Sequence, residues 1–257
     1  MKRVKRLSML GLLLLAASLL TVSCKRDVSV LVDSATTVSR NLTGFEKIEI
    51  TGSPTVYYTQ SDSFSVKVTG PERLVSDIVT EVHDKTLFVR NKGKFGVFNV
   101  QFGQGVDLSV RVTSPDLIGI QLIGSGDFIS KKRIDTDYMR VQLRGSGDIQ
   151  ISDLLCDHCI TELTGSGDVT IDRLETEVSE VALVGSGDVD LKQWNVGQTD
   201  LSLKGSGEIS VDFVEGCKRV DVKLQGSGDI DLKGKVDRFN AKKTGSGDID
   251  TKRLIVP

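Results

Sequence analysis

A four-residue string, Gly-Ser-Gly followed by an acidic residue, occurs seven times between residues 124 and 248 of this 257-residue chain. Successive copies begin 19 to 21 residues apart, at Gly124, Gly145, Gly165, Gly185, Gly205, Gly226 and Gly245. A near-constant period of this length is typical of repeat architectures, in which each unit buries its apolar side chains only against its neighbours. The repeat therefore constrains the fold more than any other feature of the sequence.

The segments between these strings alternate between apolar and polar residues. Val169 and Ile171 follow the acid of one repeat, and Val181 and Leu183 precede the next glycine. A period of two indicates β-strands. The pattern predicts an all-β chain whose coils of about 20 residues stack as a parallel β-helix, or β-solenoid, rising ~4.8 Å per coil. Each coil has one further apolar residue between its two strands. In four successive coils this residue is Leu154, Leu174, Trp194 and Val214.

The repeated string has the composition of a sharp turn. Glycine adopts positive φ angles and admits a close neighbouring backbone, while serine and the acid can bond backbone amides that a turn leaves unpaired. We therefore assign structural corner roles to the two glycines and the acid of each copy: Gly124, Gly126 and Asp127; Gly145, Gly147 and Asp148; Gly165, Gly167 and Asp168; Gly185, Gly187 and Asp188; Gly205, Gly207 and Glu208; Gly226, Gly228 and Asp229; and Gly245, Gly247 and Asp248.

Stacked acids repel one another, so the sequence must offset their charge. Side chains at every second position of a strand share a face, and each of three acidic pairs has a lysine two residues further on, at Lys192, Lys233 and Lys252. Calcium-binding β-rolls carry Gly- and Asp-rich repeats of nine residues, a period that differs from this one. We predict solvated structural corners without a metal. Cation binding stays as the alternative, at Asp229, Asp231, Asp248 and Asp250.

The N-terminal segment has the layout of an export signal. Four cations among residues 2–6 precede an apolar run from Leu7 to Val22, and Leu20-Thr21-Val22-Ser23-Cys24 resembles the bacterial lipobox. We predict a signal peptide over residues 1–23, a lipidated Cys24 and a tether over residues 24–44, with an ordinary signal peptide and an incidental Cys24 as the alternative. Removal of the four cations changes the formal net charge from −2 to −6. Because a domain of this charge is not attracted to an anionic membrane, only the lipid would hold it there.

The serial corners, together with the segments Gly44–Ile50 and Val66–Leu74, resemble the head GIN domain family. This is a family of bacterial envelope proteins named for a role as the heads of autotransporter adhesins. The resemblance covers about residues 45–257 and implies a right-handed β-helix in a surface or envelope setting, with no catalytic residues. Glu208 departs from the repeated pattern, which argues against a strict metal geometry for the acids.

Residues 45–123 have the same strand texture without the repeated string. Phe45–Tyr58, Ser63–Thr69, Lys85–Arg90 and Val106–Val112 are predicted strands, and Pro71–Val79 is a predicted short helix. No linker separates this region from Gly124. We therefore predict one solenoid domain over residues 45–257, with irregular opening coils over 45–123 that cap its first coil, and regular coils over 124–257.

Two further clusters have no assigned chemistry. Cys156 and Cys159 have the spacing of half a zinc site or of a redox motif, and either a local disulfide or two buried thiols fits them. Cys217 is expected three coils away, ~14 Å along the stack and too far to bridge. Three phenylalanines, Phe95, Phe98 and Phe102, either cover the end of the core or form a contact patch.

The charge balance and histidine content exclude several functions. Lys and Arg number 33 against 35 Asp and Glu, which provides no basic surface for nucleic acid. The two histidines, His83 and His158, lie far apart in the sequence. We predict an exported, lipid-anchored protein of the outer membrane that acts as an adhesin-like binding module for a glycan or protein ligand, without a cofactor or catalysis. A carbohydrate-active β-helix enzyme and a structural or sensory envelope module are the alternatives.

Overall fold

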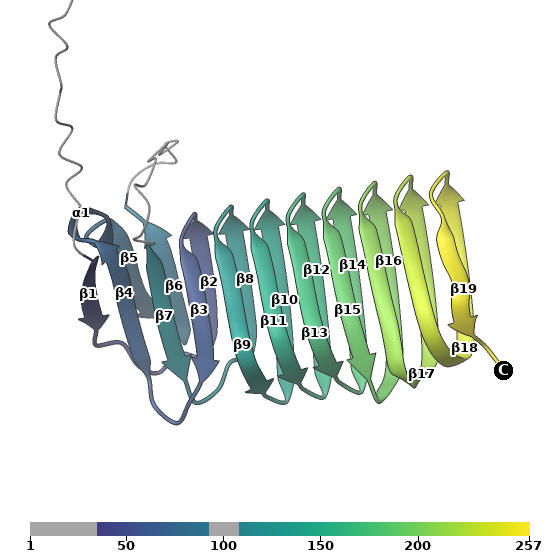
Figure 1. Ribbon diagram of the computed structural model, residues 1–257, viewed down its shortest axis with the longest axis horizontal. Helices are drawn as coiled ribbons and strands as arrows, with labels where there is room; N and C mark the ends of the chain where they lie inside the picture. Colours follow the sequence, from purple (N-terminus) through teal and green to yellow (C-terminus); the bar gives the residue numbers. More distant parts are fainter. Residues whose placement is uncertain (1–34, 93–107) are drawn as a thin grey trace, which may run out of the picture. The chain divides into compact units, whose positions relative to one another are not determined.

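The computed structural model describes residues 35–92 and 108–257. They form stacked coils whose 19 strands make one continuous, mostly parallel sheet with two faces, here called sheet 1 and sheet 2, and each regular coil contributes one strand to each (Figure 1). Two long strands, β17 (Glu208–Gly226) and β18 (Asp229–Gly245), pass from one sheet to the other. The prediction of an all-β solenoid with coils of about 20 residues is confirmed.

Sheet 1 contains the strands that lead into the repeated string. In stacking order they are β5 (Ile78–His83), β6 (Thr86–Asn91), β2 (Lys47–Gly52), β8 (Gly119–Gly124), β10 (Tyr138–Gly145), β12 (His158–Gly165), β14 (Val178–Gly185), β16 (Val196–Gly205) and the second halves of β17 and β18.

Sheet 2 contains the strands that follow the string. They are β1 (Ala35–Arg40), β4 (Ser65–Pro71), β7 (Ser109–Ser114), β3 (Thr55–Gln60), β9 (Asp127–Asp135), β11 (Asp148–Leu155), β13 (Asp168–Glu175), β15 (Asp188–Trp194), the first halves of β17 and β18, and β19 (Ile249–Ile255).

The period of the sequence fixes the register of the coils. Each corner glycine pairs with the equivalent glycine of the next coil, as Gly145 does with Gly165 and Gly165 with Gly185. Side chains at every second position therefore stack in columns inside the coils. One inner column of sheet 1 consists of leucines that are at most 2% exposed: Leu122, Leu143, Leu163, Leu183, Leu203 and Leu224.

The last inward position of sheet 2 differs from the prediction. Leu154 and Leu174 pair as expected, but a register shift then places Gln193 beside Leu174 and Phe213 beside Gln193. Trp194 therefore turns outward, where the Arg173 guanidinium lies 4.8 Å from the centre of its ring. Val214 is 46% exposed. Of the four apolar residues noted between the strands, Leu154 and Leu174 are therefore buried whereas Trp194 and Val214 are not, because the strand slips by one residue at this coil.

Gln193 is fully buried among aliphatic side chains and is satisfied by two hydroxyl groups. Its Nε2 donates to Ser179 Oγ at 2.9 Å, and Thr199 Oγ1 donates to its Oε1 at 2.7 Å. Ser179 and Thr199 belong to adjacent strands of sheet 1, β14 and β16. The side chain therefore links the two sheets across the interior, which offsets the cost of burying an amide.

The stacking order at the N-terminal end departs from the sequence order. The coil formed by β2 and β3 lies between the β6–β7 coil, which comes later in the chain, and the β8–β9 coil. Beyond β6 and β7, antiparallel strands close this end: β5 pairs with β6, and β4 pairs with β7 and with β1. Such short antiparallel strands are expected where an open parallel edge must be covered.

Three local features at this end refine the sequence prediction. The helix is the single turn α1 (Glu72–Val75), and the rest of the predicted Pro71–Val79 helix leads into β5. Phe45–Tyr58 divides into β2 and β3. β1 lies inside the predicted tether. No helix of the described residues is long and apolar enough to cross a bilayer.

Candidate functional site

The repeated glycines lie directly against the backbone of the preceding coil. The first glycine of each string has a positive φ, for example 137° at Gly165. The second does not, but a Cβ added at Gly167 would lie 2.0 Å from the carbonyl oxygen of Gly147. The backbone N–H groups of Ser186 and Gly187 both donate to the carbonyl oxygen of Gly165, at 2.9 and 3.2 Å. The close approach that these bonds require leaves no room for a side chain.

The acid of the string bonds the next coil through its side chain. The backbone N–H of Asp168 donates to Asp148 Oδ1 at 3.3 Å, and that of Asp188 donates to Asp168 Oδ1 at 3.2 Å. In the same way, the backbone N–H of Glu208 donates to Asp188 Oδ1, and that of Asp248 donates to Asp229 Oδ1. The column of acids is thus also a column of hydrogen-bond acceptors for amides at the corner.

Glu208 interrupts this series. Its carboxylate accepts no hydrogen bond from the Asp229 backbone among the described residues, and the Asp229 N–H donates to the Gly207 carbonyl oxygen at 3.1 Å. Burial, followed by repulsion from Asp188, Asp231, Asp229 and Asp190, raises the pKa of Glu208. Asp127 likewise leaves the next corner amide, the Asp148 N–H, to the Gly126 carbonyl oxygen at 3.3 Å.

One corner escaped the sequence analysis. Gly52, with φ 100°, pairs with Gly124, and its carbonyl oxygen accepts the N–H groups of Ser125 and Gly126. Its string reads Gly52-Ser53-Pro54, so it shares only the first two residues of the repeat. The signal that could have revealed it is a Gly-Ser pair between two alternating segments.

The corner acids predict a pH dependence of stability. Burial, and repulsion from Asp168 and Asp127, raise the pKa of Asp148 above its ordinary value. A carboxyl group whose pKa is higher in the folded than in the unfolded chain destabilises the fold when it is ionised. The free energy of unfolding therefore falls as the pH rises from the pKa of the unfolded chain to that of the folded protein. We expect Asp148→Asn, which keeps the acceptor for Asp168 N–H, to unfold at a higher temperature than the parent at pH 7 and at the same temperature near pH 3.

Asp221→Asn is the matched control, because the pKa of Asp221 is lowered by its hydrogen bond with Arg219. This variant should lose stability at pH 7 relative to the parent, and the difference should vanish as the acid protonates. Thermal unfolding at both pH values measures the two effects. If both variants changed the unfolding temperature by the same amount and in the same direction, the opposite pKa shifts assigned to Asp148 and Asp221 would be wrong.

The lysines neutralise the acids differently from the prediction. Lys252 pairs with Asp250 of its own coil, at 3.2 Å. Lys192 instead pairs with Asp172 and Lys233 with Asp212, each on the preceding coil. The expectation of a lysine for each pair within one coil is wrong at these two positions, because neighbouring coils lie as close as residues two apart in a strand.

The four acids of the cation hypothesis all have partners. Asp229 accepts the Asp248 amide, Asp231 pairs with Arg253, Asp248 with Lys243 and Asp250 with Lys252. Among residues 35–92 and 108–257, no group of three or more His, Cys, Asp or Glu side chains is placed to hold a metal ion. The acids thus contact amides and cationic side chains of adjacent coils.

The cysteines contribute to the core. Cys156, Cys159 and Cys217 are free thiols, and all three are buried. Cys156 contacts Thr176 Oγ1 at 3.8 Å, and Cys159 contacts Thr161 Oγ1 at the same distance. A hydrogen bond with Cys156, together with burial, raises the pKa of Cys159 well above its ordinary value. Of the two alternatives, the structure therefore contains buried thiols.

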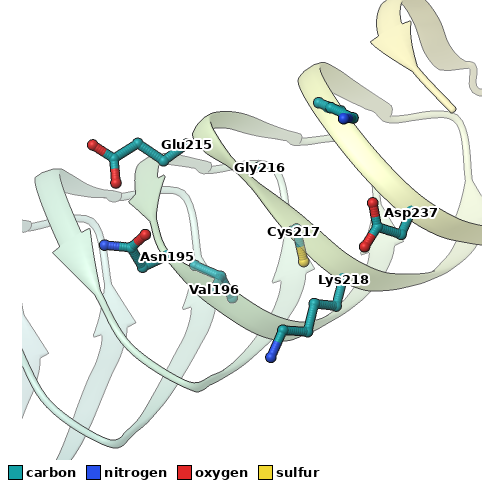
Figure 2. Close-up of a pocket in the computed structure, with 8 residues that line it drawn as sticks. Asn195, Val196, Glu215, Gly216, Cys217, Lys218 and Asp237 are labelled. Atoms are coloured by element: carbon teal, nitrogen blue, oxygen red, sulfur yellow. The ribbon is translucent and has the colours of Figure 1, made fainter. Parts of the chain in front are cut away.

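A first hollow surrounds Cys217 where the coils leave the regular repeat. It has a volume of about 420 Å³ and is lined by Asn195, Val196, Glu215, Gly216, Cys217, Lys218, Lys235 and Asp237. Figure 2 shows Cys217 between the corners that carry Glu215 and Asp237. Its thiol donates to the Arg219 carbonyl oxygen at 3.1 Å, and burial raises its pKa. These properties describe an inert thiol beneath a polar corner.

The outer face of sheet 1 carries ordered columns of mostly polar side chains. Successive coils place Arg140, Ile160, Glu180, Asp200 and Asp221 in one column. The adjacent column, on the side nearer the repeated string, consists of Glu49, Gln121, Gln142, Glu162, Ala182, Ser202 and Lys223.

Ion pairs and hydrogen bonds hold this face in place. Arg140 and Gln142 both bond Glu162, at 3.3 and 2.5 Å. Further along, the His158 ring lies 2.9 Å from Glu180, Gln198 donates to Asp200 and Arg219 pairs with Asp221. Glu162 and Glu180 thus have partners on a neighbouring strand, and Asp200 and Asp221 have partners on their own strand, which orders the face before any ligand arrives.

Two hollows lie on the outer face of sheet 1. The Ala182 hollow, about 570 Å³, lies over Ala182 and Ser202 and is bordered by Glu162, Glu180 and Asp200, with Arg219, Asp221 and Lys223 at its far side. The Tyr138 hollow, about 440 Å³, lies over Gly119 and is bordered by Lys47, Glu49, Thr86, Gln121, Tyr138, Arg140 and Gln142. Small residues in columns of longer side chains create both.

Sequence reasoning assigned none of these surface residues to a site. The alternation indicated that they face outward, but their grouping depends on the register between coils. Cys24 and the cluster of Phe95, Phe98 and Phe102 lie outside the described residues.

Solved structures from two bacterial genera share this architecture. A putative adhesin from Bacteroides fragilis is 26% identical, with a TM-score of 0.74 over 86% of this chain and 97% of that chain. A putative lipid binding protein and a putative adhesin from Parabacteroides distasonis are 22% and 20% identical, with TM-scores of 0.69 and 0.67 over 86% of this chain and 97% of each of theirs. The latter two show the fold alone. No curated protein matches the chain.

The sequence also matches one family model along nearly all of the described solenoid. The model is described as "Putative auto-transporter adhesin, head GIN domain", and it matches residues 44–215 and 175–257. Together the two matches include every copy of the repeated string and both surface hollows. The chain belongs to the head GIN domain family.

Proposed function

We propose that this protein is an exported, lipid-anchored envelope protein whose solenoid binds a surface ligand through the outer face of sheet 1, without catalysis. The observation that carries the proposal is the pair of hollows on one face, where Glu162, Glu180 and Asp221 already have side-chain partners. A binding surface built on rigid strands loses little conformational entropy when a ligand is bound. Membership of an adhesin family supports a binding role at the cell surface.

Cys24 provides the proposed attachment. It follows the apolar run Leu7–Val22 in the sequence, and the first described strand, β1, begins shortly after it at Ala35. Several acyl chains on one cysteine bind a bilayer far more durably than a single chain. The solenoid would then be held near the outer membrane by a short segment at the end that carries β1.

Labelling of cells with an alkyne analogue of palmitate tests the anchor. We expect the full chain to incorporate the label and to fractionate with membranes, and Cys24→Ser to do neither. Cys217→Ser, which removes a buried thiol, is the matched control and should keep both properties. An unlabelled parent chain, or a labelled Cys24→Ser variant, would exclude lipidation of this residue.

Binding of the detergent-solubilised chain to intact envelope preparations tests the face. Ala182→Arg places a long side chain in the Ala182 hollow and should weaken binding by about tenfold or more. Thr170→Arg makes the same change on the outer side of sheet 2, where Thr170 stacks between Gln150 and Asp190, and should leave binding unchanged. Equal losses in both variants would argue against sheet 1 as the contact face.

A further inference from the structure

The Tyr138 hollow combines an exposed aromatic ring with uncommitted polar groups. Tyr138 is 36% exposed, and its ring packs edge to face against His158, with ring centres 5.6 Å apart and an interplanar angle of 82°. His158 is itself held by Glu180 at 2.9 Å. The tyrosine is therefore supported from the adjacent coil while part of its ring stays open to solvent. Such a ring offers an apolar surface with a polar end.

The floor of the hollow exists because of Gly119. This residue pairs with Lys47 on one side and with Arg140 on the other, so it lies between two residues with long side chains. A Cβ added at Gly119 would meet nothing closer than Lys47 Cγ at 3.4 Å, and the backbone φ is not positive. The backbone thus tolerates a side chain here, unlike at the corners, and the space above Gly119 is not required by the fold.

The walls provide groups that both donate and accept hydrogen bonds. Gln121 makes no side-chain hydrogen bond to any described residue, and it lies between Glu49 and Gln142 in its column. Amides of this kind match hydroxyl groups, which also donate and accept. The lining has two cations, Lys47 and Arg140, and one carboxylate, Glu49. Arg140 is neutralised by Glu162, which lies outside the lining at 3.3 Å, so no strongly cationic surface remains.

The chemistry of the hollow distinguishes among ligand classes. A nucleic acid or another polyanion requires a strongly cationic surface, which the lining does not supply. A protein interface or a lipid surface requires a larger apolar area. Among the described residues, the exposed large apolar side chains are Tyr138, Val184, Val214, Ile255 and Val256, and only Tyr138 borders the hollow. A polyhydroxylated, uncharged ligand fits one aromatic ring surrounded by amides.

We propose that the Tyr138 hollow is a subsite for an uncharged oligosaccharide. This inference rests on the proposed function, because it names the ligand class for the same face of sheet 1. One sugar ring lies against Tyr138, and its hydroxyl groups bond Gln121, Gln142 and Glu49. A chain that runs along the solenoid axis reaches the Ala182 hollow, which lies three to four coils away, or ~17 Å at ~4.8 Å per coil.

Affinity electrophoresis of the full chain in gels containing mannan, xylan or a soluble β-glucan tests the subsite, with polygalacturonate as the charged comparison. We expect retardation by at least one neutral polysaccharide. Tyr138→Ala removes the ring and Gly119→Leu fills the hollow, and each should raise the dissociation constant by about tenfold or more. Thr170→Leu on sheet 2 is the control and should bind as the parent does. Near-ultraviolet circular dichroism confirms that each variant is folded.

Treatment of envelope material separates this inference from the proposed function. Periodate destroys vicinal diols and should abolish binding, whereas protease should leave it intact. Retention by no neutral polysaccharide, retention by polygalacturonate alone, or full affinity in both hollow variants overturns the carbohydrate assignment. If envelope binding still depends on Ala182 and is lost after protease, the face binds a protein and only the carbohydrate inference fails.

Discussion

Gly167→Ala is expected to lower the free energy of unfolding by at least ~3 kcal/mol. The added methyl group would lie 2.0 Å from the Gly147 carbonyl oxygen, which is backbone and cannot rotate away. The corner would have to move, and its movement would break the bonds from Ser166 and Gly167 to Gly145, at 2.9 and 3.2 Å. Because each coil is supported only by its neighbours, the damage should extend to the coils on both sides.

Gly44→Ala separates this clash from the loss of glycine's backbone freedom. Gly44 has φ 76°, but a Cβ there would meet no atom within 4 Å. Its replacement should cost only ~1 kcal/mol, the penalty of a left-handed conformation. Urea denaturation measures both variants, and hydrogen exchange shows which coils open. If the two substitutions cost the same, close packing between coils does not explain the glycines.

Gln193→Ala is expected to cost ~2–5 kcal/mol, the usual range for emptying a buried position. The substitution leaves a cavity beside Leu174 and Phe213 and removes the partners of the Ser179 and Thr199 hydroxyl groups. Buried hydroxyl groups without partners add their own penalty. Both effects act at a position that joins the two sheets.

Gln193→Leu distinguishes the two contributions. Leucine fills the space and matches Leu154 and Leu174 in the same column, so this variant should recover the packing part of the loss. Thermal unfolding of the parent and the two variants gives the comparison. A leucine variant no more stable than the alanine variant would show that the hydrogen bonds, rather than the filled volume, stabilise this coil.

The regular coils could be predicted because their sequence repeats the same local instructions. Gly165-Ser166-Gly167 marks a corner, and the alternation after Asp168 marks which side chains enter the core. Since equivalent corners must lie side by side, the period also gave the register of most coils. These two signals were enough for the architecture of residues 124–257.

Other features depend on contacts that no local pattern encodes. The one-residue slip that buries Gln193 follows from how its coil fits between Leu174 and Phe213. The Tyr138 hollow requires Gly119 and Tyr138, 19 residues apart, to meet through the pairing of β8 with β10. The sequence indicated that these residues face outward, but only the register between coils shows which of them adjoin.

The exchanged order of the first coils affects how the chain can fold as it leaves the cell interior. β2 and β3 emerge early from an N-terminus-first export channel, but their partners are β6 and β8 on one sheet and β7 and β9 on the other. β2 can therefore gain its first partner only after Asn91 has emerged, and β2 and β3 are paired on both sides only after about residue 130. Chaperones would have their longest opportunity to act at this stage, after which each later coil can add directly to the one before it.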